Sequence, residues 1–293
     1  MDTLIAPFLN GTADGALLLI AALGLALTFG QMGVINMAHG EFLLAGALCA
    51  YWTQQVVANT NLSILFALPV AFLAAGLLGL LLEVTIIQWM YDRPLDTLLA
   101  TVGVSLGLQQ LFLQHYPSGV PVEKPSLLDG QWHVLGYAWP LRQVFTIVLA
   151  MVCLAGLGAL LKYTSFGRRI RATVQNRALA ETLGVSTRSI DRITFFVGSG
   201  LAGVGGVAAS LIGGTNSQLG TRYIILAFLV VVAGGLGQLR GAVIAAWTVG
   251  VVTAYLADWT TGSLAQVITF VLVVIFLQVK PQGLFTIRTR GLA

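Results

Sequence analysis

Charged residues are scarce in this sequence. Only 9% of its 293 residues are Asp, Glu, Lys or Arg, and 57% are hydrophobic, which gives a mean hydropathy of +0.89. Soluble domains contain roughly 25% charged residues, so this composition excludes a soluble globular protein. It predicts an integral membrane protein. Because no low-complexity linker interrupts the chain, residues 1–293 are expected to form a single transmembrane domain.

Residues that bind metals, cofactors or nucleotides are equally few. Cys49 and Cys153 lie in apolar runs, far from any histidine at ligand spacing, so we interpret them as packing residues and expect no metal site and no cofactor. The three lysines are Lys124, Lys162 and Lys280, and none precedes Ser or Thr. A Walker A motif needs that pair, so another chain must bind ATP if ATP drives this protein. We expect no enzymatic activity and no nucleic-acid partner.

Apolar runs predict an all-α, polytopic membrane protein with about 8 to 10 transmembrane helices. A span needs roughly 20 mainly apolar residues, and this criterion selects residues 15–35, 42–57, 63–88, 97–114, 143–161, 193–212, 223–239, 242–257 and 264–279. No Lys or Arg precedes the first run, so we expect it to be retained rather than cleaved as a signal peptide. The two shortest spans, 42–57 and 242–257, each follow a Gly-rich polar break, which is a sequence pointer to a transport site.

Basic residues predict the orientation of the chain. Lys280, Arg288 and Arg290 close the C-terminal tail, and seven of the 15 basic residues lie between the fifth and sixth spans: Lys162, Arg168, Arg169, Arg171, Arg177, Arg188 and Arg192. Loops rich in Lys and Arg remain in the cytoplasm. Four spans separate the two segments and five precede the first, so the N-terminus is expected outside and the C-terminus in the cytoplasm.

A polar cluster separates the first two apolar runs. Asn36, His39 and Glu41 lie within residues 30–42, and polar groups at membrane depth are costly unless they serve a function. They could line a translocation path or its cytoplasmic gate. Alternatively, Asn36 caps the second span and Glu41 occupies its first turn, where a negative charge favours the helix dipole.

The basic loop contains an expected amphipathic helix. Residues 168–183 contain neither Gly nor Pro and carry Ile170, Val174, Leu179 and Leu183 at roughly helical spacing. Gly184 can end this helix. Such a helix could lie on anionic lipid or dock into a partner protein. In the following span, small residues recur every four positions from Gly198 to Ser210 and predict a face on which another helix packs closely.

Three segments resemble a known family. Gly33–Glu41, with the sequence GVINMAHGE, resembles the signature near the start of branched-chain amino acid and urea permeases of ABC importers. Residues 93–101 and Gln109–Gln110 resemble the urea-type subgroup, and residues 228–237 resemble the family's later motif. The resemblance extends from about Gly15 to Phe285.

The resemblance implies a permease domain in the bacterial cytoplasmic (inner) membrane. It implies a homologous second permease subunit, two cytoplasmic ATPase subunits and an extracytoplasmic solute-binding protein as partners. The cargo is then a small neutral or zwitterionic solute: urea or a short amide by subgroup, with a branched-chain amino acid as the alternative. A stand-alone channel or secondary carrier is a further alternative.

Candidate functional residues follow from the polar residues of the spans and from the basic loop, in which the resemblance implies a coupling helix. The substrate path is expected to include Asn36, His39, Glu41 and Gln109. The coupling helix that contacts the ATPase is expected at about residues 168–184, and its candidate contact residues are Arg171, Leu179, Glu181, Leu183 and Gly184.

Overall fold

Helix α8 (Thr187–Gly213) runs through the middle of a helical bundle and packs against α1, α2 and α3. The computed structural model describes residues 2–91, 93–134 and 136–285, so Arg288 and Arg290 of the expected basic tail lie outside the described residues. The other helices are α1 (Asp2–Met32), α2 (His39–Val56), α3 (Thr60–Thr85), α4 (Pro94–His115), α5 (Leu141–Tyr163), α6 (Ser165–Gln175), α7 (Arg177–Thr182), α9 (Leu219–Gly234), α10 (Leu239–Trp259) and α11 (Gly262–Val279). Two 3₁₀ turns (Ile87–Trp89 and Ser126–Leu128) and a hairpin of antiparallel strands β1 (Gln131–Val134) and β2 (Tyr137–Pro140) complete the elements.

Local sequence signals explain several helix ends. The side chain of Asn59 accepts hydrogen bonds from the backbone amides of Asn61 and Leu62 and so caps α3. Pro94 occupies the first turn of α4, where its missing amide costs nothing. Thr261 caps α11 by accepting a hydrogen bond from the amide of Leu264.

Each of the nine expected spans overlaps a helix, but not all of these helices are long and apolar enough to cross a membrane. Within the described residues, seven helices are long and apolar enough to cross a membrane: α1, α3, α4, α5, α8, α10 and α11. The expected 8 to 10 transmembrane helices are therefore not confirmed. The two remaining helices, α2 and α9, contain 18 and 16 residues. Helix α2 packs against α3, α8 and α9, and a helix surrounded by protein need not be as apolar as one that faces lipid.

The boundaries correct two expectations. Helix α1 begins at Asp2, well before the expected start at residue 15, and contains 31 residues. The expected short span 242–257 corresponds to α10, which contains 21 residues. The short helix after a break is instead α9, which follows the non-helical residues 214–218.

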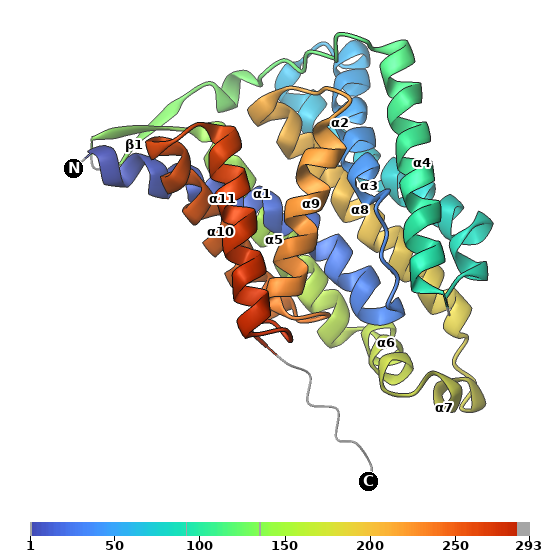
Figure 1. Cartoon of the computed structure of the whole chain (residues 1–293). Helices are drawn as coiled ribbons and strands as arrows, with labels where there is room; N and C mark the ends of the chain where they lie inside the picture. Colours follow the sequence, from blue (N-terminus) through green and yellow to red (C-terminus); the bar gives the residue numbers. More distant parts are fainter. Residues whose placement is uncertain (1, 92, 135, 286–293) are drawn as a thin grey trace.

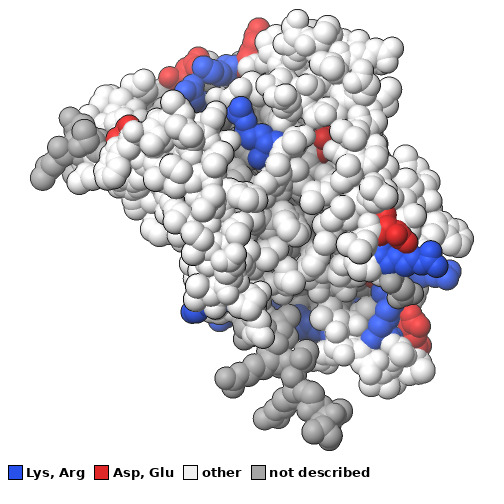
Figure 2. All heavy atoms as spheres, in the orientation of Figure 1, with Lys and Arg blue, Asp and Glu red and all other residues white. Residues whose placement is uncertain are grey.

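The two ends of the bundle carry different elements (Figure 1). The β-hairpin lies near the start of α1 at one end, and α6 and α7 lie at the opposite end. In Figure 2, most charged side chains gather near these two ends, and the band between them is largely uncharged. Leu77, Leu99 and Ile275, on α3, α4 and α11, are all more than half exposed. A surface of this kind suits lipid rather than water.

Glycine allows α2 and α8 to approach at backbone distance. A Cβ added at Gly206 would overlap the carbonyl oxygen of Leu43, and one added at Gly46 would overlap that of Gly203. Gly206 belongs to the small-residue face expected from the four-residue spacing in α8, whereas Gly203 does not. Because lipid offers no hydrophobic drive for helix association, such close van der Waals packing holds membrane helices together.

We therefore predict that Gly206→Ala destabilises the bundle. Overpacking typically costs about 1–3 kcal/mol, whereas an added Cβ at Gly156 in α5 meets no atom within 4 Å. Gly156→Ala is the matched control and should leave stability unchanged or raised, since alanine is favoured over glycine in a helix by about 1 kcal/mol. Thermal unfolding of the detergent-purified chain measures both, and a wild-type melting temperature for Gly206→Ala would contradict the packing model.

Candidate functional site

The polar cluster lies where the chain breaks between α1 and α2. Gly33 has a φ of +67°, and residues 33–36 are not helical. The side chains of Asn36, His39 and Glu41 are buried, with exposed fractions of 1%, 1% and 3%. They are therefore enclosed by the helices and do not lie on a membrane-facing surface.

The hydrogen-bond partners of these three residues bear on the alternative in which Asn36 caps α2. Nε2 of His39 lies 3.1 Å from the carbonyl oxygen of Ala21. The residue that caps α2 is Ala38, so Asn36 is not its cap, although Glu41 does lie in the first turn. Within the described residues, neither atom of the Asn36 side-chain amide has a hydrogen-bond partner, and Oε2 of Glu41 also has none. Buried unpaired polar atoms are uncommon in native structures and call for an explanation.

Helix α4 carries a polar stripe that faces this break. Thr97, Thr101, Ser105 and Gln109 recur every four residues and so share one face of the helix. The hydroxyl of Thr101 accepts a hydrogen bond from the amide of Met37 at 3.1 Å. The stripe was not predicted, although its four-residue spacing is visible in the sequence.

The C-terminal part of the stripe joins α2 to the start of α9. Ser105 Oγ donates to Oε1 of Glu41 at 3.0 Å. Gln109 Nε2 donates to the carbonyl oxygen of Ser217 at 2.9 Å and to Oγ1 of Thr221 at 3.1 Å. Two of the expected path residues, Glu41 and Gln109, are thus linked through α4, and Gln109 reaches the non-helical segment 214–218 before α9.

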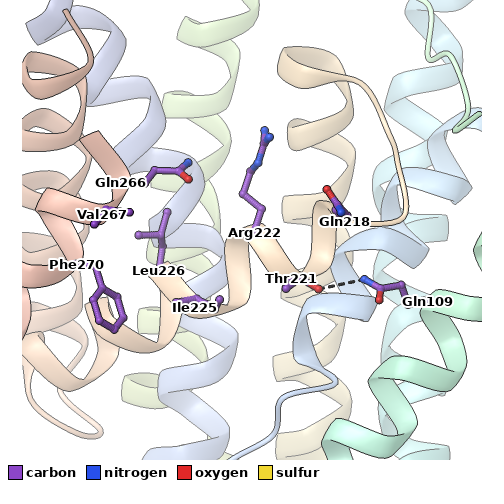
Figure 3. Close-up of a pocket in the computed structure, with 9 residues that line it drawn as sticks. All are labelled: Gln109, Gln218, Thr221, Arg222, Ile225, Leu226, Gln266, Val267 and Phe270. Atoms are coloured by element: carbon purple, nitrogen blue, oxygen red, sulfur yellow. Dashed lines mark hydrogen bonds between the residues drawn. The ribbon is translucent and has the colours of Figure 1, made fainter. Parts of the chain in front are cut away.

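A cavity of about 550 Å³ opens beside Gln109, between α4, α9 and α11 (Figure 3). It is lined by Gln109, Gln218, Thr221, Arg222, Ile225, Leu226, Gln266, Val267 and Phe270. Of the four expected path residues, only Gln109 lines this cavity, and Glu41 lines another of about 330 Å³ between α2, α3 and α4. Arg222 was missed, although a charged residue at the edge of an apolar run is a detectable signal.

The expected amphipathic helix 168–183 is wrong in one respect: it is two helices. Asn176 is extended, with a φ of −157°, and separates α6 from α7. Its side chain accepts a hydrogen bond from the amide of Leu179 at 3.0 Å, so this residue ends one helix and caps the next. Gly184 has a φ of +82° and ends the segment as expected.

The two faces of the α6–α7 segment differ. Ile170 is buried, whereas Leu179 and Leu183 are 56% and 76% exposed. Arg171 faces its own chain, since its Nη1 donates to the carbonyl oxygen of Leu161 at 2.6 Å. The Glu181 side chain is 53% exposed, but its carboxylate is engaged within the chain, because it accepts a hydrogen bond from Thr187 Oγ1 at 2.5 Å. Of the five candidate contact residues, Leu179 and Leu183 therefore present apolar side chains to the surroundings.

A buried carboxylate fixes α7 to the bundle. Asp191 on α8 is fully buried, and its Oδ2 lies 2.5 Å from Nη2 of Arg177 on α7. Its Oδ1 accepts a hydrogen bond from Gln31 Nε2, at the end of α1, at 2.9 Å. Thr194 Oγ1 in turn donates to Oε1 of Gln31. Three helices thus meet at one carboxylate.

A second buried carboxylate lies beside the first. Glu83 on α3 pairs with Arg192 at 3.5 Å and accepts a hydrogen bond from the Tyr91 hydroxyl at 2.5 Å. Burial and this hydrogen bond raise the pKa of Tyr91, so the phenol keeps its proton and remains a donor. The guanidinium of Arg177 lies over the Tyr91 ring, 5.4 Å from its centre. Helix α3 is thereby joined to the same cluster.

The residue types that commonly bind metals are His, Cys, Asp and Glu. Across residues 2–91, 93–134 and 136–285, no group of three His, Cys, Asp or Glu side chains could hold a metal ion. Cys49 and Cys153 are both free thiols.

Comparison with known proteins identifies similar chains. Residues 8–277 match the family described as branched-chain amino acid transport system / permease component. The high-affinity branched-chain amino acid transport system permease protein LivH of Escherichia coli strain K12 is 27% identical over 296 residues, which cover 94% of this chain and 93% of that protein. LivH of Salmonella typhimurium and BraD of Pseudomonas aeruginosa are each 26% identical, with the same coverage. No solved structure shows a significant match.

We predict that Arg177→Ala destabilises the protein more than loss of an exposed ion pair. Without Arg177, the buried Asp191 carboxylate loses its cation, and breaking a buried pair costs about 3 kcal/mol. Asp96→Asn is the control, because the Arg93–Asp96 pair spans 3.9 Å and its side chains are 75% and 56% exposed, so its loss costs less than about 1 kcal/mol. Thermal unfolding compares the two variants, and equal melting temperatures would contradict the role of Asp191.

Proposed function

The chain belongs to the family of permease components of branched-chain amino acid transport systems, and we propose that it imports branched-chain amino acids as the membrane subunit of an ATP-driven transporter. The seven long apolar helices among the described residues and the similarity to membrane permeases support a multi-pass membrane protein. The observation that carries the proposal is the family match, which extends over residues 8–277. The names of the relatives favour branched-chain amino acids over the urea or short amides expected from subgroup resemblance.

We propose that three kinds of partner complete the transporter: a homologous second permease, a pair of cytoplasmic ATPases and an extracytoplasmic solute-binding protein. The chain has no Lys followed by Ser or Thr, which supports ATP hydrolysis by partner chains rather than by the permease. In this assembly the N-terminus lies outside, and the α6–α7 segment and the C-terminus lie in the cytoplasm, in accordance with the distribution of basic residues.

The α6–α7 segment is our candidate for contact with the ATPase. Two exposed leucines on a short helix can fill an apolar groove of a partner. The bonds of Asp191 to Arg177 and Gln31 join α7 to α1. A displacement of α7 would therefore move α1 with it, and such rigid elements can transmit conformational changes.

The break at residues 33–38 and the polar stripe of α4 are our candidate for the solute path. Asn36, His39 and Glu41 supply buried polar atoms, some without partners, and Gln109 borders the cavity. Polar groups with unused hydrogen-bonding capacity within a membrane bundle suit a solute that exchanges water for protein contacts during passage.

The function is tested by uptake into vesicles that contain the reconstituted complex. We expect ATP-dependent, saturable uptake of labelled leucine in the presence of the solute-binding protein, and urea uptake at the level of empty vesicles. ATP-dependent uptake of urea without leucine would contradict the proposed substrate class.

The same assay tests the path. Glu41→Gln keeps an oxygen that can accept the Ser105 hydrogen bond but removes the charge, and we expect at least a fivefold loss of leucine uptake with normal assembly of the complex. Uptake within twofold of wild type would exclude Glu41 from the path.

We predict that Leu179→Asp uncouples ATP hydrolysis from transport. A carboxylate in an apolar groove must be desolvated without a partner, so we expect the complex to insert into the membrane but to lose substrate-stimulated ATP hydrolysis and uptake. Leu179→Met is the control, since it conserves volume and apolarity and should retain both activities. Normal stimulated hydrolysis in Leu179→Asp would return this segment to the role of a lipid-facing anchor.

A further inference from the structure

Arg222 brings a positive charge to the wall of the cavity beside Gln109. It lies in the first turn of α9, and its side chain lines the cavity between α4 and α11. Gln109, across the cavity, precedes the last residue of α4 by six positions, which is roughly 9 Å along the helix. The cavity therefore lies within the length of the helices and not beyond their ends. Arg222 itself is exposed in the first turn of α9, so it adds a cation to a cavity that also has apolar walls.

The surroundings of Arg222 contain no anion that pairs with it. The ion pairs among the described residues involve Arg93, Arg177 and Arg192, but not Arg222. In Figure 3 its side chain extends away from the Gln109–Thr221 hydrogen bond, between Gln218 and Gln266. Its guanidinium therefore has donors available for a ligand.

The walls of the cavity divide into a polar and an apolar part. Arg222, Gln218 and Gln266 supply a cation and two amides, and Leu226, Val267 and Phe270 supply apolar surface. A guanidinium binds a carboxylate through two parallel hydrogen bonds. Small-molecule sites typically combine a few polar groups of this kind with mostly apolar walls.

We propose that this cavity is a solute-binding site in which Arg222 binds the carboxylate of the transported amino acid and Leu226, Val267 and Phe270 contact its apolar side chain. The inference rests on the proposed function and adds the mode of recognition within the membrane. It also separates the two substrate classes, because urea has neither a carboxylate nor an apolar tail. An anionic lipid headgroup offers the same chemistry as a carboxylate, so the experiment must distinguish the two sources.

Saturation-transfer NMR on the full permease–ATPase complex in nanodiscs, without the solute-binding protein, detects weak binding directly. Three probes share one branched apolar tail: leucine, 4-methylpentanoate, which lacks the amine, and 3-methylbutylamine, which lacks the carboxylate. We expect the first two to give Arg222-dependent signals and the third to give only background. Arg222→Gln should reduce the leucine signal at least fivefold, and Arg222→Lys should retain part of it.

Arg240→Gln is the matched control. Arg240 is also an exposed arginine in the first turn of an apolar helix, α10, but it lies outside the cavity. This variant should bind leucine like wild type. A wild-type leucine signal in Arg222→Gln would overturn the assignment. A leucine signal that is lost whenever the nanodisc contains phosphatidylglycerol would assign the Arg222 side chain to anionic lipid and would also overturn the proposal.

Uptake measurements distinguish failure of the proposed function from failure of the role assigned to Arg222. With saturating solute-binding protein, Arg222→Gln should lower the maximal rate of leucine import at least tenfold. If the wild-type complex imports no leucine, the proposed function fails. If it imports leucine and Arg222→Gln does so at the same maximal rate, only the role of Arg222 fails.

Discussion

The close approach of α2 and α8 is the constraint on which the other features depend. At the Gly46–Gly203 and Gly206–Leu43 contacts no side chain separates the two backbones. Lipid cannot drive helices together as water does, so surface complementarity at such crossings determines the arrangement. Helix α8 in this position holds Asp191 against Arg177 and Gln31, and α2 holds the polar break against α4. A shift of this crossing would therefore disturb both the Asp191 cluster and the polar break.

The polar groups divide the subunit into two connected regions. At one end, the carboxylates of Asp191 and Glu83 join α1, α3, α7 and α8. Deeper in the bundle, the stripe on α4 joins the break after α1 to the start of α9. Helix α1 belongs to both regions, because Gln31 lies at its end and the break follows directly. Motion at the α6–α7 segment thus has a direct physical route to the polar break.

Much of the fold could be predicted from the sequence, since all nine expected spans overlap a helix and the four-residue spacing in α8 indicated its packing face. The division of α6 from α7 was missed because helical periodicity continues across Asn176, whose capping role depends on one local hydrogen bond. The pairing of Asp191 with Arg177 and Gln31 joins residues up to 160 positions apart, and no local pattern encodes it. The α4 stripe and Arg222 left detectable signals, but their meaning required the neighbouring helices.

The shortness of α9 has a consequence for the backbone at its ends. Its 16 residues extend roughly 24 Å, less than the roughly 30 Å of a bilayer's hydrocarbon core. Some of the irregular backbone next to α9, at 214–218 or 235–238, must then lie at a depth where lipid cannot satisfy amide and carbonyl groups. The chain itself supplies part of the shield at 214–218, because the amide of Val120 donates to the carbonyl oxygen of Thr215 at 2.9 Å and Gln109 donates to that of Ser217.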